Sequence, residues 1–432
     1  MVRRLNVYEA VENRLKVVFD NFDYVYVSFS GGKDSSVLLN LCIDYIRRHN
    51  LKRRLGVFHI DYEIQYKQTI DFVEQILKQN RDIIDVYHCC VPFKVSTCTS
   101  MYSKYWRPWD PSKRDLWVRP LPEGALTADD FDFFSDDLWD YNFQYLFSTW
   151  LKHRLGCSRV CSLVGIRTQE SYKRWLAIHS RKTFRLFGNY KWAHILSQGI
   201  YNAYPIFDWT INDVWTANGK MGWAYNSLYD LYYQAGVPLT RQRVASPFIS
   251  EAIPMLHIYR AIDPDTWGKM ISRVNGVNFA GMYGTSTAMG WRSIKCPKGF
   301  SWERYMEFLL STLPTHIRHN YEEKLRVSKK FWRERGGCLA PETIDKLRKY
   351  NVQFELGGVS NYHTDKVPVR MKYIDDIDIK EFKEIPSYKR MCVCILKNDH
   401  SCKYMGFAPV TKERELKKAI QEKYKNLKNG KV

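Results

Sequence analysis

The sequence predicts an α/β fold, a parallel twisted sheet with helices on both faces, followed by a mostly helical, basic C-terminal region. Strand-like runs (YVYVSF from 24, LGVFHI from 55, IIDVYHCC from 83) alternate with helical patterns. Their starts lie about thirty residues apart, the length of a strand–helix–strand crossover. After about residue 216 this alternation stops, and aromatic helical segments such as NSLYDLYYQAGV and SWERYMEFLLSTL follow. We therefore expect three regions: 1–215, 216–317 and a basic region over 318–432.

The elements of the first region follow in order. The opening MVRRLNVYEAVENRLKVVFD has no apolar signal core and predicts an amphipathic helix. Helices are also expected in DSSVLLNLCIDYIRRHN, where Val37, Leu38 and Leu41 share a face, and in YKQTIDFVEQILKQN. An insertion over about 94–140, rich in Trp and Pro and then acidic, interrupts the pattern as a lid, a docking loop or an excursion without a role. A helix at about 142–154 and a strand, CSLVGI, then resume it.

Composition limits the class of protein. The 432 residues are 45% hydrophobic, enough for two or three folded domains, and no run of eighteen apolar residues suggests a membrane span. Eleven cysteines without a secretion signal indicate reduced thiols and a cytoplasmic protein. The net charge is +20 although residues 120–151 hold seven carboxylates and no Lys or Arg. This excess suits a polyanion such as nucleic acid, and the alternative is a basic surface that serves solubility.

A phosphate-binding loop is predicted where the first strand meets its helix, in VSFSGGKDSS. Glycines let the backbone approach an anion, and the first N–H groups of a helix point at it. A Walker A loop does not fit, because Val27 and Asp34 stand where that motif has Gly and Ser or Thr. Asp34 at the helix start suits the helix dipole and could help to hold Mg²⁺. The alternative is a tight turn that only caps the helix.

Three motifs in order carry a family resemblance. Ser-x-Ser-Gly-Gly-Lys-Asp-Ser-Ser resembles the PP-loop of the adenine nucleotide α-hydrolase superfamily, which has a Rossmann-like fold. LVGIRTQESYKRW (163–175) is similar to the Gly-Ile-Arg-x-x-Glu-Ser-x-x-Arg signature of the phosphoadenosine phosphosulfate (PAPS) reductase family. YPIFDWTINDVW (204–215) looks like that family's Pro-Ile-x-Asp-Trp segment. In HIDYEIQYKQTIDF (59–72), Asp61 matches the family's second-strand aspartate, whereas Gln68-Thr69 replaces its Glu-Thr pair.

The resemblance implies a binding site for ATP, PAPS or another adenine nucleotide, with Mg²⁺ at Asp34. It implies phosphate contacts from Ser28, Ser30, Gly31, Gly32, Lys33, Asp34, Ser35 and Ser36. It implies further nucleotide contacts from Asp61, Gly165, Arg167, Glu170 and Arg174. Lys33 and Asp34 would be catalytic, with both side chains exposed at the strand ends.

Departures from the family argue against reductase activity. The reductases' Glu-Cys-Gly-x-His segment does not occur, and no Cys-x-x-Cys follows Cys89-Cys90, so no iron–sulfur cluster is expected. The other cysteines suggest core thiols rather than zinc ligands, with Cys392 and Cys394 on one face of a strand. We therefore expect cleavage of ATP to AMP and pyrophosphate. The alternatives are a non-catalytic nucleotide sensor that binds nucleic acid and, less favoured, a PAPS or APS reductase.

The C-terminal half suggests partners. LYDLYYQAGVPLTRQRVASPF, DPDTWGKMISRVNG and PSYKRMCVCILKND resemble the family branch that includes immunoglobulin-binding regulator A, often found beside a ParB-like partner. Two basic stretches are candidates for nucleic acid: KLRVSKKFWRER (324–335), with Phe331 and Trp332 for stacking, and the tail over 412–432. For each stretch the alternative is a solvated helix. No membrane partner is expected.

Overall fold

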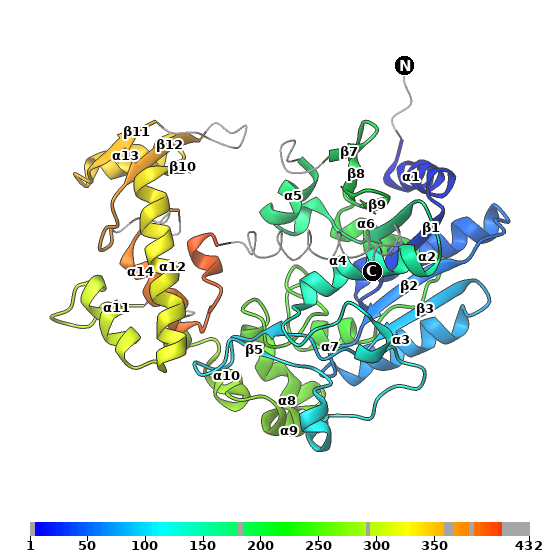
Figure 1. Cartoon of the computed structure of the whole chain (residues 1–432), viewed down its shortest axis with the longest axis horizontal. Helices are drawn as coiled ribbons and strands as arrows, with labels where there is room; N and C mark the ends of the chain where they lie inside the picture. Colours follow the sequence, from blue (N-terminus) through cyan, green and yellow to red (C-terminus); the bar gives the residue numbers. More distant parts are fainter. Residues whose placement is uncertain are drawn as a thin grey trace, which may run out of the picture.

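The computed structural model describes residues 5–179, 185–290, 294–357, 366–377, 379 and 384–407. Its N-terminal part is built on a seven-stranded sheet with the order β3-β2-β1-β6-β9-β8-β7 (Figure 1). The strands are β1 (Tyr24–Ser28), β2 (Leu55–Ile60), β3 (Ile84–Cys89), β6 (Val160–Val164), β7 (Arg185–Phe187), β8 (Tyr190–Ser197) and β9 (Ile200–Ala203). β1, β2, β3, β6 and β9 run parallel. The sequence predicts the parallel sheet and the first four of these strands, whereas β9 was not anticipated.

The sheet has an antiparallel edge that the sequence analysis missed. β8 pairs antiparallel with β9 and with β7. Only Gly188 and Asn189 separate β7 from β8, and Gly188 has a positive φ of 56°. Two-residue Gly-Asn connections are typical of β-hairpins, so the signal was present in the sequence.

Helices cover both faces of the sheet because its central strands are apolar on both sides. Val25 and Val27 pack into one cluster, with α1 (Val7–Asn21), α2 (Lys33–Arg48), α3 (Lys67–Gln79) and α6 (Ile211–Met221). Tyr26, between them, points the opposite way into a second cluster with α4 (Asp140–Arg154). The alternation of side chains along a strand produces these two layers.

The aromatic-rich region shares its core with the sheet. The cluster around Tyr26 extends to Met289 and takes in the buried side chains of four further helices. These are α7 (Leu228–Gln234), α8 (Tyr259–Ile262), α9 (Pro264–Arg273) and α10 (Val277–Tyr283). Hydrophobic packing thus joins residues up to about 290 to the sheet, and α5 (Tyr172–His179) lies beside β8.

The C-terminal region stands to one side of the sheet and has two hydrophobic clusters of its own (Figure 1). Its helices are α11 (Trp302–Ser311), α12 (Thr315–Glu334), α13 (Pro341–Lys349) and α14 (Tyr388–Leu396). A small antiparallel sheet, which was not predicted, joins β10 (Gly337–Leu339), β12 (Val367–Met371) and β11 (Phe354–Leu356). The segment around Cys392 and Cys394 was expected to be a strand but forms the helix α14. Both thiols are buried.

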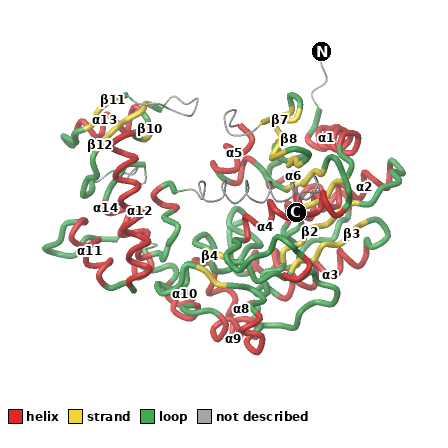
Figure 2. The backbone as a smooth tube through the Cα atoms, in the orientation of Figure 1, coloured by secondary structure: helices red, strands yellow, loops and turns green. Residues whose placement is uncertain are grey.

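The insertion over 94–140 is mostly loop (Figure 2), with β4 (Val95–Ser96), β5 (Tyr105–Trp106) and short 3₁₀ turns. The insertion contributes to the hydrophobic core, because Trp106, Phe131 and Phe133 are buried there. Its start also holds the C-terminal region. The Ser100 carbonyl oxygen lies 2.9 Å from His400 Nε2, and the Cys98 carbonyl oxygen accepts from Asn398 Nδ2 at 3.4 Å. Within the described ranges no helix has the length and apolar character needed to cross a bilayer.

Candidate nucleotide-binding site

The phosphate loop lies at the carboxyl end of β1, where the strand order reverses between β1 and β6. Ligands of open α/β sheets bind at such a point. Gly31 has φ +73°, and a Cβ there would come within 2.7 Å of Val73 Cγ2, so the turn requires glycine. The hydroxyls of Ser35 and Ser36 both donate to the Gly32 carbonyl oxygen, at 3.0 and 2.9 Å. These serines therefore shape the loop.

The end of β6 packs directly against the start of α2. A Cβ on Gly165 would lie 3.0 Å from the carbonyl carbon and oxygen of Asp34, so only glycine allows this approach. Arg167 Nε contacts Asp34 Oδ1 at 2.5 Å, and Arg167 Nη2 lies 3.6 Å from Glu170. Glu170 is also ion-paired with Arg174. Burial raises the pKa of the Glu170 carboxyl, although the charge of Arg174 opposes this.

Lys33 is buried rather than exposed as the sequence analysis expected. Its side chain is 5% exposed and that of Asp34 is 14% exposed. Its ammonium donates to the Gln242 carbonyl oxygen at 2.9 Å and lies 3.6 Å from Asp34 Oδ2. Burial lowers the pKa of Lys33 despite the opposing charge of Asp34. The exposure was misjudged because residues from far along the chain cover the strand end.

Asp61 follows β2 but does not line the cavity, and its carboxylate is bonded within a buried cluster. His88 Nε2 lies 2.9 Å from Asp61 Oδ2, and Asp61 Oδ1 accepts from the Glu63 N–H and is ion-paired with Arg119. Burial favours the neutral carboxyl, but the His88 hydrogen bond and the Arg119 charge prevail and hold the pKa of Asp61 below its usual range. Both carboxylate oxygens are thus already bound by protein groups.

The side chains of His59, Asp61 and His88 come close enough together to suggest a metal site. Their ligand atoms lie within 4.8 Å of one another. The Arg119 guanidinium already neutralises the carboxylate, however, and both Asp61 oxygens are bonded to protein groups. We therefore assign this cluster a structural role.

A second buried ion pair beside Asp61 was not anticipated. Glu63 is fully buried with a φ of +66°, and both its oxygens bond Arg273 of α9 at 2.8 Å. It also accepts from the Trp109 N–H of the insertion at 2.7 Å. The insertion and α9 are thereby fixed to the turn that follows β2. Only a Glu two residues after Asp61 was visible in the sequence, without its partners.

A cavity of about 530 Å³ opens at the loop, within the size range of small-molecule sites. The predicted residues that line it are Ser28, Ser30, Gly32, Lys33, Asp34, Ser35, Gly165, Glu170 and Arg174. Gly31, Ser36, Asp61 and Arg167 lie behind this surface. Further lining side chains that the sequence analysis missed are Tyr62, Gln65, Tyr66, Tyr229, Tyr232, Arg241, Arg243 and Glu251.

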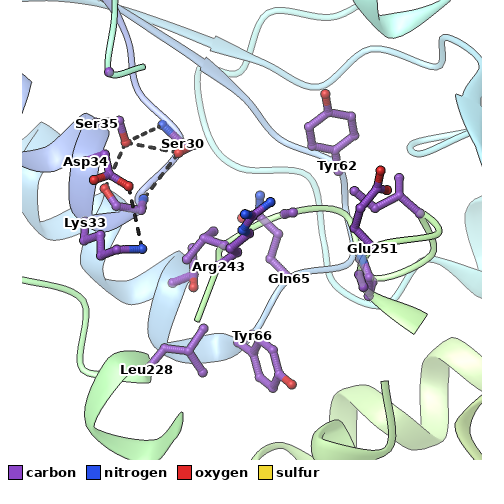
Figure 3. Close-up of a pocket in the computed structure, with 18 of the residues that line it drawn as sticks. Ser30, Lys33, Asp34, Ser35, Tyr62, Gln65, Tyr66, Leu228, Arg243 and Glu251 are labelled. Carbon is purple, nitrogen blue, oxygen red and sulfur yellow. Dashed lines mark hydrogen bonds and ion pairs between the residues drawn. The ribbon is translucent and has the colours of Figure 1, made fainter. Parts of the chain in front are cut away.

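Two arginines that line the cavity, Arg241 and Arg243, form no ion pair with any described residue. Arg243 reaches into the space between Lys33 and Gln65 (Figure 3), and its charge contributes to lowering the pKa of Lys33. Within the described part of the chain, neither the Arg241 nor the Arg243 guanidinium forms a hydrogen bond or an ion pair. Unpaired cations that converge on a cavity favour an anionic ligand. The sequence signal was the pair of arginines in LTRQR.

Two family models match the chain. Residues 24–240 match the phosphoadenosine phosphosulfate reductase domain, and residues 236–416 match a domain of unknown function, DUF3440. The uncharacterized protein YbdN of Escherichia coli (strain K12) is 30% identical over 410 residues, covering 94% of this chain and 91% of that protein. The uncharacterized protein MJ0973 of Methanocaldococcus jannaschii is 26% identical over 214 residues, 48% of this chain and 38% of that protein.

Among solved structures, the phosphate complex of PAPS reductase from Candida auris overlaps with a TM-score of 0.31 at 17% identity, over 56% of this chain and 89% of that one. The U34-tRNA thiolase NcsA from Methanococcus maripaludis gives a TM-score of 0.31 at 12% identity, over 64% and 78%. The domain match over 24–240 spans the loop, the Gly165–Arg174 motif and the strands that hold them. The chain belongs to the phosphoadenosine phosphosulfate reductase domain family.

Proposed function

We propose that the protein binds an adenine nucleotide in the cavity at the phosphate loop and cleaves ATP at the α-phosphate. Water attacks the α-phosphorus, the bond to the bridging oxygen breaks, and pyrophosphate leaves with AMP as the other product. If an acceptor oxygen attacks instead, pyrophosphate leaves and the AMP group is first bonded to that oxygen, from which water then releases AMP. The observation that carries this proposal is the set of cations that line the cavity. Lys33 lies at the loop with Arg243 across from it (Figure 3), and Arg241 is a further lining residue. Fixed positive charge at departing phosphate groups stabilises the transition state.

The other lining residues support a nucleotide of this size. Tyr66, Tyr232 and Tyr259 form an aromatic wall of the cavity, on which a base can pack. Tyr66 is held in place by stacking on Tyr259, with ring centroids 3.5 Å apart. Together the loop and the wall present a polar end and an apolar end, as a nucleotide requires.

Asp34 fits a role in holding Mg²⁺. Its Oδ1 is taken by Arg167, while Oδ2 is 3.6 Å from the Lys33 ammonium at the cavity. Mg²⁺ is commonly bound by one or two carboxylates together with substrate phosphates, so one available oxygen suffices. The ion would neutralise phosphate charge there. Arg167 would act as a positioning residue that fixes the Asp34 carboxylate.

The positions of the thiols favour hydrolysis over sulfur reduction. A thiol reductase needs a cysteine with access to its site. Of the described residues that line the cavity, none is a cysteine. Cys89 and Cys90 are buried, and burial raises the pKa of both thiols. Phosphoryl transfer needs no thiol, because positioning and charge stabilisation carry it.

Nucleic acid is the proposed partner of the C-terminal region. On α12, Arg326, Lys329, Lys330 and Arg333 are basic, and Phe331 is 43% exposed and available for stacking. Trp332, the other candidate for stacking, is buried in the core beneath α12. The basic tail over 412–432 lies outside the described residues. A ParB-like protein remains part of the proposal on the resemblance of the C-terminal segments alone.

The test is to incubate the purified protein with Mg²⁺ and either ATP or PAPS and to resolve the products chromatographically. AMP and pyrophosphate from ATP support the proposal, and alkylation of accessible cysteines should leave the rate unchanged. Nucleotide binding without products would favour the sensor. Sulfite from PAPS in the presence of thioredoxin, lost on alkylation, would identify a reductase instead.

For nucleic acid, the test is retention on DNA and RNA as a function of salt. For every phosphate that the protein no longer neutralises, the slope of log K against log salt should fall by roughly 0.9 for duplex DNA and 0.7 for single strands. Deletion of 412–432 should therefore flatten the slope. Absence of retention at low salt would exclude this partner.

A further inference from the structure

Two hydrogen-bond donors of the phosphate loop are already bound by a segment from far along the chain. The Lys33 N–H donates to Tyr229 Oη, and the Lys33 ammonium donates to the Gln242 carbonyl oxygen, both at 2.9 Å. Both acceptors belong to residues 226–244, which we call the loop cap. A phosphate in this loop would accept hydrogen bonds from the same two donors.

The loop cap is seated directly on the glycines of the loop. Asn226 Nδ2 donates to the Gly31 carbonyl oxygen at 3.0 Å and to Thr69 Oγ1 at 2.9 Å. A Cβ on Gly32 would lie 3.4 Å from Tyr229 Oη and 3.6 Å from Val244 Cβ. Asn226, Tyr229 and Gln242 are all buried. The segment therefore packs directly against the loop and forms one wall of the cavity.

We propose that the loop cap is a lock that phosphate displaces. An incoming phosphate group takes the Lys33 N–H from Tyr229 and the ammonium from Gln242, so these two contacts of the cap open, while Arg241 and Arg243 of the cap still line the cavity. The inference rests on the proposed function and adds regulation to the same site. Asn226 bonds a carbonyl oxygen and a hydroxyl that phosphate does not compete for, so it remains as the hinge.

Contacts continue from the loop cap to the C-terminal region. The chain runs from the cap to Phe248, whose carbonyl oxygen accepts from the Cys98 N–H at 2.8 Å. Cys98 and Ser100 in turn contact Asn398 and His400. These contacts join the cap to the C-terminal region through the start of the insertion.

The first test compares Tyr229→Phe with Tyr233→Phe. Both residues lie on α7, but Tyr233 is 73% exposed and removed from the loop. The Tyr229 variant loses the acceptor that competes for the Lys33 N–H, so pyrophosphate should bind about two- to tenfold more tightly by calorimetry, the net value of one hydrogen bond. Tyr233→Phe should bind like the wild type. Unchanged or weaker binding by Tyr229→Phe would overturn the lock.

Hydrogen exchange gives the second test on the wild-type chain. Amides over 226–244 should exchange faster when pyrophosphate is added, and slower or unchanged exchange would reject the lock. ATP turnover without a change in these amides would retain the proposed function and reject the inference. Tighter pyrophosphate binding by Tyr229→Phe without ATP turnover in either protein would retain the lock and reject the proposed function. Failure of both proteins to bind pyrophosphate would reject both.

Discussion

The carboxyl ends of β1 and β2 carry similar charged side chains, yet those after β1 line the cavity, whereas the carboxylates after β2 are sealed from it. After β1, Lys33 and Asp34 line the cavity, together with unpaired arginines. After β2, Asp61 and Glu63 have every carboxylate oxygen bonded, to Arg119, Arg273, His88 and backbone N–H groups. Position at a strand end therefore does not make a ligand site. What matters is whether other parts of the chain supply the counter-charge.

The insertion over 94–140 accounts for most of this difference. Arg119 and the Trp109 N–H both come from it, and Arg273 comes from α9. A buried carboxylate with bonded partners is stable but cannot bind substrate, whereas removal of one partner leaves a costly buried charge. The β1 end keeps excess positive charge, which a phosphate ligand would neutralise.

The largest expected effect separates the two helix starts. Lys33 is the first residue of α2 and Lys67 is the first residue of α3. Lys33→Met should lower the rate of AMP formation by roughly 10²- to 10³-fold, as expected when a charge that stabilises the transition state is removed. Lys67 pairs with Asp71 on the surface, so Lys67→Met should leave the rate unchanged. Equal rates in the two variants would remove the phosphate loop from the mechanism.

The next effect should appear in stability at the β2 end. Glu63→Ala leaves Arg273 buried without its partner, which typically costs about 3–5 kcal/mol. Glu74→Ala, on the exposed face of α3, is the matched control and should change the unfolding free energy little. Urea denaturation measures both. A Glu63 variant as stable as the control would show that this pair does not brace the turn.

Local patterns predicted the parallel strands β1, β2, β3 and β6, because each is an apolar run of strand length. They missed β9, which is also parallel. They also placed the loop, since Gly-Gly before a helix start requires a particular backbone whatever surrounds it. The burial of Lys33 and the bonding of both Asp61 carboxylate oxygens by protein groups could not be predicted in this way. Both depend on contacts across large sequence separations, such as Lys33 with Gln242 and Glu63 with Arg273.

The helix at Cys392 and Cys394 illustrates a different limit. MCVCILK is apolar and contains β-branched residues, so its local preference favours a strand. In the structure it is α14, whose two thiols pack into the C-terminal core. Short apolar runs fit either a buried helix or a strand, and tertiary packing decides between them.

The smallest expected effect is the contribution of His59, at the β2 end, to the pH dependence of stability. Burial is the main cause that lowers the pKa of His59 from 6.5 to about 4, and the nearby His88 is the second cause. Below pH 6.5 the His59 imidazole is protonated in the unfolded chain but stays neutral in the folded protein. The contribution of neutral His59 to the free energy of unfolding is therefore complete above pH 6.5 and is lost as the pH falls toward 4. The shift corresponds to roughly 3 kcal/mol at most.

Asp140 partly offsets this slope, because burial raises the pKa of its carboxyl from 3.8 to about 6. Its folded form holds a proton that the unfolded chain releases, so its effect has the opposite sign between those values. Comparison of variants isolates His59. His59→Gln keeps a donor for the Phe29 carbonyl oxygen but does not titrate, and it should lose less stability than the wild type between pH 6.5 and 4 in urea denaturation. His49→Gln, on an exposed residue, is the control and should retain the wild-type change of unfolding free energy with pH. The same change in all three proteins would show that burial does not keep His59 unprotonated.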